Sequence, residues 1–441
     1  MASVLNTERN PKGAPLSTPR ALTPLSATTS TADPLSVYRR LREQWGVIAP
    51  VELEPGVNAW LVMGWEEICY VVRRERSYSR DPRNWRAWQE RTVAPDSGLG
   101  PMMFPRDNAY FADGYEHYRL RAPLDEGVSK VVDQQRMRRS VAAMCQKLIA
   151  GFAGRGEADL VAEYAAIIPM LAVADLFGLD TAAGHELQRA LIALFGSGED
   201  SQAGNRRFEE ILGGVMKARK QHPADDLTTA FLNHPNLHDD GEVAQSMVLM
   251  ISAGYETTTT WIAQTLRLML TDKRFGGQIR GGSLGIDDAL DEVLWRDPPM
   301  ANMPARYAMH DTELGGQRIL RGDALILGLA AANNDPKVHV SDPWMEFGNR
   351  AHLAWSTGPH TCPAQLPARI ITHTAVEHAF NLLPGLRLSV PEEQLTVQPS
   401  PWTRCPAALP VRFPVTVTPE SSLEVTNDRS GGTRVPARST W

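Results

Sequence analysis

The feature that most constrains the fold is a long apolar segment that runs from Asp240 to about Thr271. Its apolar pattern hardly pauses, which predicts one continuous helix. At 1.5 Å per residue, a helix of about 30 residues is about 45 Å long. A helix of that length must cross the whole body of the protein. The rest of the chain therefore has to pack around it, which favours a mainly helical fold.

Strand patterns are short and lie away from this segment. Two of them flank Pro55-Gly56 and predict a hairpin. After residue 300 the apolar period changes, and Gly315-Gly316 separates two further strand-like runs. Residues 386–390 and 409–417 also have strand patterns. The sequence thus predicts a mainly α fold with small peripheral β-sheets.

Domain organisation follows from composition along the 441 residues. Residues 1–32 are rich in Ser, Thr, Pro and Ala and have little apolar periodicity, which is typical of a disordered arm. Residues 418–441 have a similar composition and are predicted to be a flexible tail. No repeat or Gly/Ser linker divides residues 33–417, so we expect a single domain there.

Charge and cysteine usage exclude several classes of protein. The formal net charge of -6 gives no reason to expect a nucleic acid or an anionic membrane as partner. No run reaches about 18 uninterrupted apolar residues, and the N-terminus lacks a basic-then-apolar signal pattern. The four cysteines, Cys69, Cys145, Cys362 and Cys405, form neither a disulfide framework nor a zinc motif. We expect a soluble, cytoplasmic, monomeric protein that binds neither membrane nor nucleic acid.

Residues 355–369 concentrate turn and helix-start signals around Cys362. Gly358-Pro359 predicts a tight turn, and Pro363 is suited to the first position of a helix. A thiol at a helix N-terminus is pulled toward the thiolate, which is the metal-binding form. Two interpretations stay open for Cys362 at this point: a small buried apolar residue in a bent loop, or an axial ligand of haem iron.

The neighbours of Cys362 favour the second interpretation. The spacing aromatic-x-x-Gly-x-His-x-Cys, followed by Ala-Arg, resembles the haem loop of the cytochrome P-450 family. The matching positions are Trp355, Gly358, His360, Cys362 and Arg369. Ser356 and Ala364 stand where that family usually has Gly. The resemblance implies a haem b held by Cys362 and the helical prism fold of the family.

A second segment of interest, residues 253–258, lies inside the predicted long helix. Gly254 costs about 1 kcal/mol there relative to Ala, which indicates that something approaches the backbone closely. The Thr257 hydroxyl can bond back to the carbonyl of Ala253. Alone, the segment also fits a helix with a tolerated Gly and an exposed Glu. Together with Cys362 it resembles the oxygen-activating segment of the family, which implies that Thr257 takes part in a hydrogen-bond relay and that Glu256 helps to deliver protons.

Basic groups that suit a pair of carboxylates occur in three places. His117 and Arg121 are four residues apart and share a helix face. A solvated basic face would explain this pair equally well. The resemblance implies that both contact the haem propionates, together with Arg306 and His360.

One motif departs from the family. The resemblance predicts Glu-x-x-Arg before the pair Pro298-Pro299. Glu292 matches the Glu, but Trp295 stands in the Arg position. Arg296 and Arg350 are the two candidate replacements for the missing partner. We therefore expect the usual structural cluster to be altered.

The resemblance implies an oxidoreductase that uses haem and dioxygen to hydroxylate or radically couple an apolar or aromatic small molecule in secondary metabolism. Some similar bacterial enzymes couple tryptophan-containing diketopiperazines. Electrons would come from a ferredoxin and a ferredoxin reductase. Alternatives are a conventional hydroxylase of a polyketide- or terpene-like substrate, a haem-binding protein without turnover, and a helical protein without haem. The candidate substrate contacts are Trp85, Trp88, Phe104, Ile251, Ala253, Met300, Asn302, Met303 and Trp402.

Overall fold

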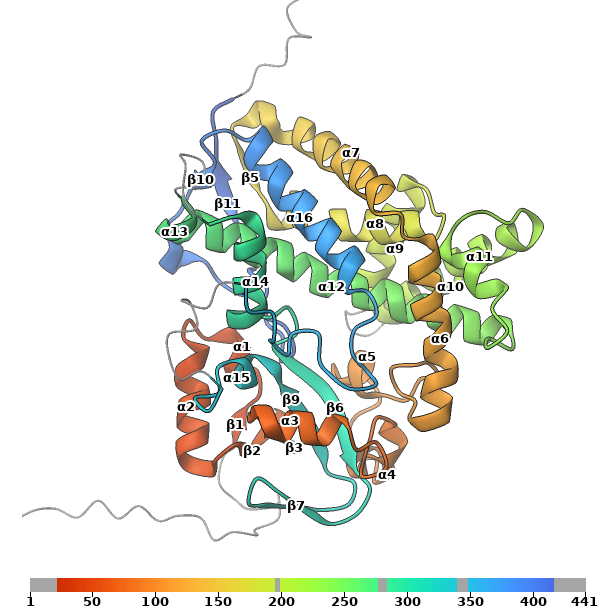
Figure 1. The fold of residues 1–441 in the computed structure, drawn as a ribbon, viewed down its shortest axis with the longest axis vertical. Helices are drawn as coiled ribbons and strands as arrows, with labels where there is room; N and C mark the ends of the chain where they lie inside the picture. Colours follow the sequence, from red (N-terminus) through yellow and green to blue (C-terminus); the bar gives the residue numbers. More distant parts are fainter. Residues whose placement is uncertain (1–21, 195–198, 277–283, 339–347, 416–441) are drawn as a thin grey trace, which may run out of the picture.

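Helices dominate the part of the chain that this computed structural model describes, residues 22–194, 199–276, 284–338 and 348–415 (Figure 1). The longer helices are α2 Pro34–Trp45, α3 Trp65–Val72, α6 Gly114–Val131, α7 Gln134–Phe152, α8 Ile168–Leu176, α9 Thr181–Leu194, α10 Glu199–Gln221, α11 Leu227–Leu232, α12 Asp240–Thr271, α14 Ile286–Arg296 and α16 Gln365–Leu382. Short helices are α1 Ala27–Ser30, α4 Arg86–Gln89, α5 Gly100–Met103, α13 Lys273–Gly276 and α15 Leu329–Asn333. The prediction of a mainly α fold is confirmed.

The predicted long helix exists as α12, which has 32 residues and crosses the middle of the molecule (Figure 1). The Asp239 carboxylate caps its first turn by accepting a hydrogen bond from the backbone N–H of Glu242. Helices α8, α14 and α16 pack against α12. Long helices are held by such packing rather than by propensity alone.

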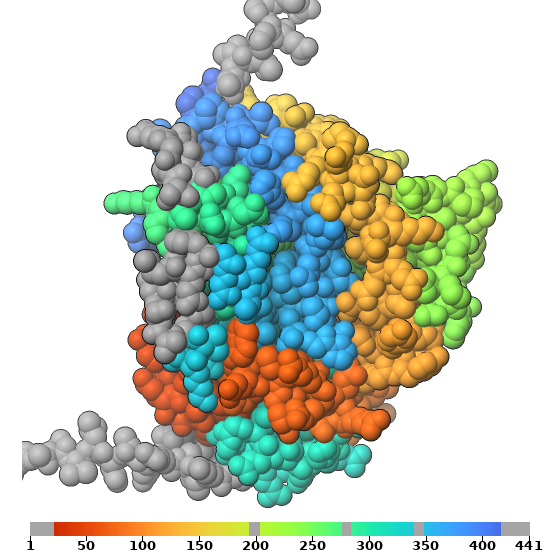
Figure 2. Space-filling view, in the orientation of Figure 1, coloured from red at the N-terminus to blue at the C-terminus, as the bar shows by residue number. Residues whose placement is uncertain are grey.

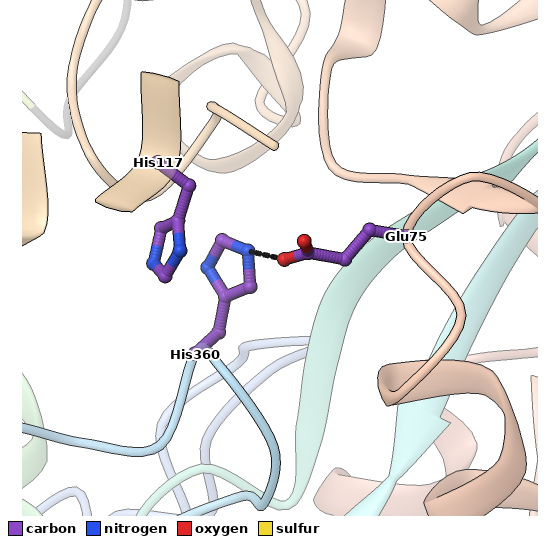
Figure 3. Close-up of side chains that lie close together, drawn as sticks. All are labelled: Glu75, His117 and His360. Atoms are coloured by element: carbon purple, nitrogen blue, oxygen red, sulfur yellow. Dashed lines mark ion pairs between the residues drawn. The ribbon is translucent and has the colours of Figure 1, made fainter. Parts of the chain in front are cut away.

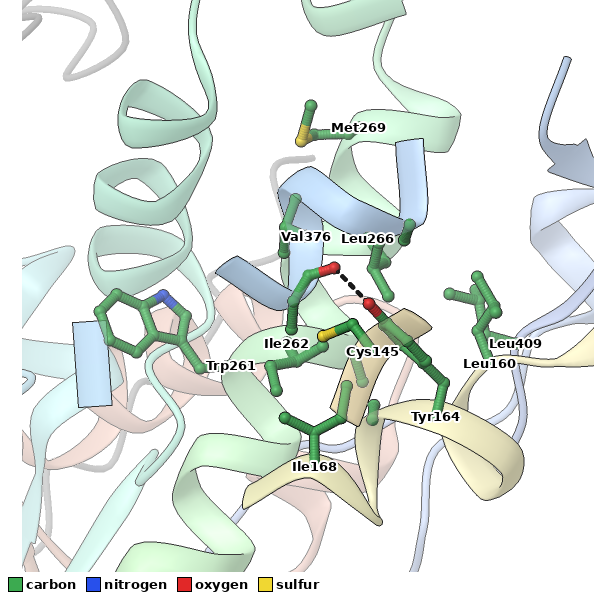
Figure 4. Close-up of a cluster of buried hydrophobic side chains, with 14 of the residues drawn as sticks. Cys145, Leu160, Tyr164, Ile168, Trp261, Ile262, Leu266, Met269, Val376 and Leu409 are labelled. Atoms are coloured by element: carbon green, nitrogen blue, oxygen red, sulfur yellow. Dashed lines mark hydrogen bonds between the residues drawn. The ribbon is translucent and has the colours of Figure 1, made fainter. Parts of the chain in front are cut away.

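The largest hydrophobic core surrounds the C-terminal half of α12 (Figure 4). Trp261 and Leu266 of α12 are buried there against Val376 of α16. The buried Tyr164 hydroxyl donates a 2.7 Å hydrogen bond to the carbonyl of Ala375 inside this core. α12 and α16 are therefore fixed relative to each other on either side of the site described below.

The β-structure is peripheral, as predicted. The strands are β1 Thr23–Pro24, β2 Ile48–Glu54, β3 Val57–Val62, β4 Tyr78–Ser79, β5 Glu157–Asp159, β6 Asn302–Ala308, β7 Thr312–Leu314, β8 Gln317–Ile319, β9 Ala324–Gly328, β10 Arg387–Leu388 and β11 Pro410–Arg412. The described strands form sheets in the orders β1-β2-β3-β9-β6-β4, β10-β11-β5 and β7-β8. β2 and β3 make the predicted hairpin, with Val51 opposite Ala59.

The ordered chain begins earlier than the expected position 33. Strand β1 pairs with β2, and Leu25 and Thr29 are fully buried. The remainder of the predicted arm, residues 1–21, and the predicted tail lie outside the described residues.

Helix α16 and the loop before it occupy the centre of one face, between the N-terminal elements and helices α6 and α7 (Figure 2). Among the described helices, none is long and apolar enough by itself to span a membrane. A pair bent by 119°, Val161–Leu176 with Thr181–Ala193, meets the criteria of length and composition only when taken together.

Candidate active site

A cavity of about 220 Å³ separates α12 from the loop of residues 355–364, which we call the Cys loop. Cys362 lies on one wall, and Ala253 and Thr257 of α12 lie on another. Two segments about a hundred residues apart in the sequence, both singled out above, thus share one chamber.

The Cys loop is held by bonds from within the protein. The backbone N–H of Cys362 donates to the carbonyl of Trp355 over 3.0 Å. The Arg121 guanidinium donates to the carbonyl of Thr361 over 2.6 Å and contacts that of Pro359. The same guanidinium pairs with Asp125 at 2.9 Å. Arg121 therefore clamps the Cys loop, in addition to lining the cavity.

Helix α16 starts later than Pro363 suggested. Its first residue is Gln365, and Ala364 is the N-cap. Burial raises the pKa of the Cys362 thiol, and the backbone N–H of Ala364 offsets only part of this effect. The terminus therefore lowers the pKa of Cys362 as expected, but burial has the larger effect, so the expected net shift toward the thiolate is wrong for the thiol itself. A thiolate at this position needs a cation such as a metal ion beside it.

Two residues of the Cys loop adopt the left-handed backbone conformation. Gly358 has φ of +74°, and a Cβ there would lie 3.2 Å from the carbonyl oxygen of Val72. Ser356 has φ of +58°. Ser356 stands where the resemblance expects Gly. Its backbone is therefore strained, because a residue with a Cβ disfavours the left-handed conformation that glycine adopts freely.

The segment 253–258 is helical throughout. The predicted bond from the Thr257 hydroxyl to the carbonyl of Ala253 is confirmed at 2.7 Å. Gly254 has a packing reason as well, since a Cβ there would lie 3.1 Å from Cγ2 of Val173 on α8. The close approach inferred from this glycine therefore includes a neighbouring helix.

Glu256 does not line the cavity with Thr257. Its carboxylate accepts a 3.0 Å hydrogen bond from the Thr403 hydroxyl. Burial raises the pKa of Glu256, and this hydrogen bond lowers it by less. The side chain is suited to holding a proton, with Thr403 as its immediate neighbour.

Arginine and histidine side chains meet at the edge of the cavity, and several of their nitrogens have no hydrogen-bond partner among the described residues. His117, Arg121 and His360 line it as predicted, and Arg306 lies beside them. The rings of His117 and His360 stack, with centroids 3.8 Å apart (Figure 3). At this edge, the buried nitrogens without a hydrogen-bond partner among the described residues are Nε and Nη2 of Arg80, Nε and Nη1 of Arg306, and Nε2 of both His117 and His360. Nη1 of Arg306 also lies 3.8 Å from Oδ1 of Asp113.

Arg80 was not found by sequence reasoning. It is 1% exposed, its guanidinium donates to the carbonyl of Pro304 over 2.6 Å, and it lies over the ring of Tyr110. Nothing in the local pattern at residue 80 signals this position, because its partners come from the chain near residue 304.

The electrostatics of this edge show a shortage of negative charge. Burial, with Arg80 nearby, lowers the pKa of Arg306 to about 9. Burial, together with the nearby charges of Arg121 and Arg306, lowers the pKa of His117 to about 4. Buried cations with unpaired donors suit a ligand with carboxylates, and the two propionates of haem fit this cradle.

Glu75 adds a carboxylate to the same edge. Its Oε1 lies 3.1 Å from Nε2 of His360 (Figure 3). The ligand atoms of Glu75, His117 and His360 lie within 4.8 Å of one another, a spacing that could hold a metal ion. The cationic surroundings described above disfavour a metal ion here and favour an anion, so we assign this group to the cofactor edge.

In the altered Glu-x-x-Arg motif, the adjacent carboxylates of Asp291 and Glu292 have separate arginine partners. Glu292 pairs with Arg296 at 2.9 Å and with Arg274 at 2.6 Å. Arg350 pairs with Asp291 instead, at 2.9 Å. Arg296 is therefore the replacement partner of Glu292.

Trp295, in the Arg position, has its own contacts. Its indole N–H donates to the carbonyl of Asn349 over 2.8 Å, and its ring stacks on Trp65 with centroids 6.2 Å apart. An aromatic contact thus occupies the place that the resemblance gives to a charged one.

Some predicted substrate contacts line the cavity: Ala253, Met300 and Met303. Cavity-lining residues that sequence reasoning missed include Ala109, Tyr110, Leu249, Met250 and Leu329. Leu249 and Met250 lie one helical turn before Ala253 and Gly254, so helical spacing from Thr257 could have found them.

The other predicted contacts lie elsewhere. Trp85 packs against Tyr307 beside the large sheet. Trp88 packs against Phe104 with the rings tilted by 53° and their centroids 4.9 Å apart. The remaining positions are Ile251, buried in the core between α8, α10 and α12; Asn302, which donates to Thr28; and Trp402, buried against the sheet.

Comparisons with known proteins agree with a haem-thiolate enzyme. The chain is 30% identical to cytochrome P450-SU2 of Streptomyces griseolus, over 78% of this chain and 86% of that protein. It is 29% identical to the 2-hydroxy-5-methyl-1-naphthoate 7-hydroxylase of Streptomyces carzinostaticus, over 87% and 95%. Among solved structures, CYP154A1 from Streptomyces coelicolor superposes with a TM-score of 0.75 at 29% identity, covering 89% of this chain and 99% of the other. No protein-family model matches the chain.

The chain belongs to the cytochrome P450 family and is a monooxygenase of that kind. Members of the family carry haem b through a cysteine thiolate. The donor set present here fits this cofactor: a cysteine on the cavity wall, and arginine and histidine nitrogens at its edge without hydrogen-bond partners among the described residues.

Proposed function

We propose that the protein oxidises an apolar or aromatic small molecule of secondary metabolism in the chamber between Cys362 and Thr257. The observation that carries the proposal is this shared cavity, with a cysteine on one wall and a hydroxyl on another. At its edge, buried arginine nitrogens have no hydrogen-bond partner among the described residues. A bound haem with a thiolate ligand supplies the activation of dioxygen.

The residues of the chain have separate roles in this proposal. Cys362 would provide the sulfur ligand of the haem iron, and Arg121 keeps the Cys loop in place. Arg80, Arg306, His117 and His360 hold the propionates. The Thr257 hydroxyl, facing the cavity, holds a proton near the reacting oxygen, and Glu256 supplies protons to it.

The cavity wall indicates the substrate class. Leu249, Met250, Met300 and Met303 make it apolar, and the Tyr110 ring offers an aromatic surface. Such a wall favours an apolar or aromatic ligand with few polar anchors.

Electrons are supplied by a ferredoxin and its reductase. The free cysteines among the described residues are consistent with a reducing, cytoplasmic setting.

Coupling is the second candidate outcome. The chain is 28% identical, over 83% of its length, to the biflaviolin synthase CYP158A1 of Streptomyces coelicolor. That name supports a search for dimeric products. The narrower hypothesis, dimerisation of tryptophan-containing diketopiperazines, draws its support from the sequence around Cys362 and Trp295.

The test has two stages. The reduced protein should give the long-wavelength absorption band of a thiolate-ligated haem–carbon monoxide complex, and Cys362→Ala should lose it. Polyketides, terpenes, naphthoates and indole cyclodipeptides are then screened by the spectral shift of the ferric protein and by products formed with a surrogate ferredoxin system.

Thr257→Ala should lower product yield, because it removes the hydroxyl from the cavity. Thr265→Ala is a matched control, since its hydroxyl bonds the carbonyl of Trp261 on the same helix, away from the cavity. A protein that shows the band but turns over none of the compounds would support a haem-binding role instead.

A further inference from the structure

The Glu256 side chain leaves α12 toward a loop near the C-terminus of the described chain. Residues 400–405 form this loop, which we call the C-terminal loop. The Thr403 hydroxyl oxygen lies 3.0 Å from Oε1 of Glu256 and 3.2 Å from Oγ of Ser400. Thr403 is 2% exposed, whereas Ser400 is partly exposed. An unbroken series of oxygen atoms therefore joins the Glu256 carboxylate to the molecular surface.

The direction of these hydrogen bonds is fixed by the backbone. Oγ of Ser400 accepts the backbone N–H groups of both Trp402 and Thr403, each at 3.1 Å. Both lone pairs of that oxygen are thereby occupied, so the Ser400 hydroxyl acts as a donor toward Thr403. The single Thr403 proton then points to Glu256. The chain of donors runs from Ser400 through Thr403 to Glu256.

The C-terminal loop is anchored on both sides of these hydroxyls. The Thr29 hydroxyl donates to the carbonyl of Ser400, and Nδ2 of Asn302 donates to that of Pro401 over 2.8 Å. Gln264 of α12 donates to the carbonyl of Arg404. These bonds keep the hydroxyls at hydrogen-bonding distance, which an exposed loop alone would not do. Asn302, a predicted substrate contact, thus holds the C-terminal loop instead of lining the cavity.

We propose that Ser400 and Thr403 form the proton-entry path to Glu256. The inference rests on the proposed function, in which Glu256 supplies protons to the cavity. Monooxygenation consumes protons and electrons together with dioxygen and releases water; here the electrons come from the external iron–sulfur donor. When Glu256 gives up its proton toward the cavity, the Thr403 proton moves to Glu256, the Ser400 proton moves to Thr403, and solvent replaces the proton on Ser400. No hydroxyl changes its net charge.

The raised pKa of Glu256 is consistent with this role. Burial is the main cause, and it keeps the carboxyl protonated closer to neutral pH than an exposed glutamic acid. A proton donor with a pKa nearer the working pH transfers protons more effectively.

The experiment compares Thr403→Val, which removes the hydroxyl at nearly constant shape, with Thr403→Ser, which keeps it. Ser400→Ala interrupts the same path one step earlier and serves if Thr403→Val does not fold. Thr265→Val removes a buried hydroxyl of α12 that lies off the path. In the holoenzyme, Thr403→Val and Ser400→Ala should divert a several-fold larger share of electrons to hydrogen peroxide and enlarge the solvent deuterium isotope effect. Thr403→Ser and Thr265→Val should behave as the wild type.

A second readout does not depend on turnover. The infrared C=O stretch of protonated Glu256, identified by its absence in Glu256→Gln, should shift to higher frequency in Thr403→Val because a hydrogen bond is lost. Wild-type peroxide share and isotope effect in both path variants would overturn the path. If Thr257→Ala uncouples the enzyme while the path variants do not, only the path fails. If the wild type forms no product at all, the proposed function fails.

Discussion

Oδ2 of Asp291 accepts a 2.9 Å hydrogen bond from Nε of Arg350, which fastens helix α14 to the loop that leads to the Cys loop. Arg369 of α16 contacts the other oxygen of Asp291 at 2.8 Å. Glu292, the next residue, pairs with Arg274 and Arg296 instead. The two adjacent carboxylates therefore have different structural roles. Asp291 joins α14 to α16 and to the loop before the Cys loop, and Glu292 joins α14 to α13.

Exchanging these two carboxylates for amides should have different effects. Asp291→Asn should shift the carbon monoxide band of the reduced protein toward the shorter wavelength of a damaged thiolate site, since the Cys loop loses an anchor. Glu292→Gln should lower the free energy of unfolding by about 1.5–3 kcal/mol, the usual contribution of a charged hydrogen bond, and keep the band. Equal loss of the band in both variants would contradict this division. Spectra and urea unfolding of the same preparations provide the measurement.

Ser356→Gly should stabilise the protein by about 0.5–1 kcal/mol. The left-handed backbone at Ser356 costs a residue with a Cβ about 1–2 kcal/mol, which glycine avoids. The larger conformational entropy that glycine loses on folding offsets about 0.5–1 kcal/mol of this gain. Ser356→Ala, which keeps the Cβ, is the control and should give no gain. Urea unfolding followed by tryptophan fluorescence distinguishes the two. A gain in the Ala variant would mean that the hydroxyl, and not the backbone, is unfavourable.

Arg80→Leu should release haem faster, because two buried guanidinium nitrogens of Arg80 have no hydrogen-bond partner among the described residues and are available for a propionate. A charged hydrogen bond contributes about 1.5–3 kcal/mol, which corresponds to roughly a 10- to 100-fold faster transfer of haem to an excess of a haem-free globin. Arg83→Leu removes an exposed arginine paired with Asp81 and Asp107, and its rate should stay near that of the wild type. Equal rates of haem transfer in both variants would show that Arg80 does not bind a propionate.

Stability should fall as the pH falls from about 6.5 to 4, in part because of His352. Burial lowers the pKa of His352 to about 4 in the folded protein, while an unfolded histidine titrates near 6.5. Between these values the unfolded chain binds more protons, so lowering the pH favours unfolding; at pH 5 the loss is about 2 kcal/mol.

The variant His352→Gln separates this effect from that of the carboxylates. Urea unfolding at pH 7 and pH 5 should show a smaller difference for the variant than for the wild type. An identical pH response of the two proteins would show that His352 is not responsible.

The sequence was most informative where one continuous segment determines the structure. The apolar run of α12, the hairpin at Pro55-Gly56 and the bond from Thr257 to Ala253 depend on neighbours a few residues away. These features follow from helix and turn chemistry, and the structure confirms them.

Features that depend on distant segments could not be predicted in this way. Arg80 reaches the site because the chain near residue 304 passes beside it. Thr403 lies next to Glu256 only because the C-terminal loop folds onto α12. Trp85 and Trp402 were assigned to the pocket by their aromatic character, but the same character suits the packing of the sheet that buries them.

The internal bonds of the Cys loop have a consequence for substitutions outside the cavity. Arg121 of helix α6 donates to the carbonyl of Thr361, the residue directly before Cys362. The position of the sulfur therefore depends on the position of α6, and a change that displaces this helix reaches the iron ligand without altering any residue of the cavity wall.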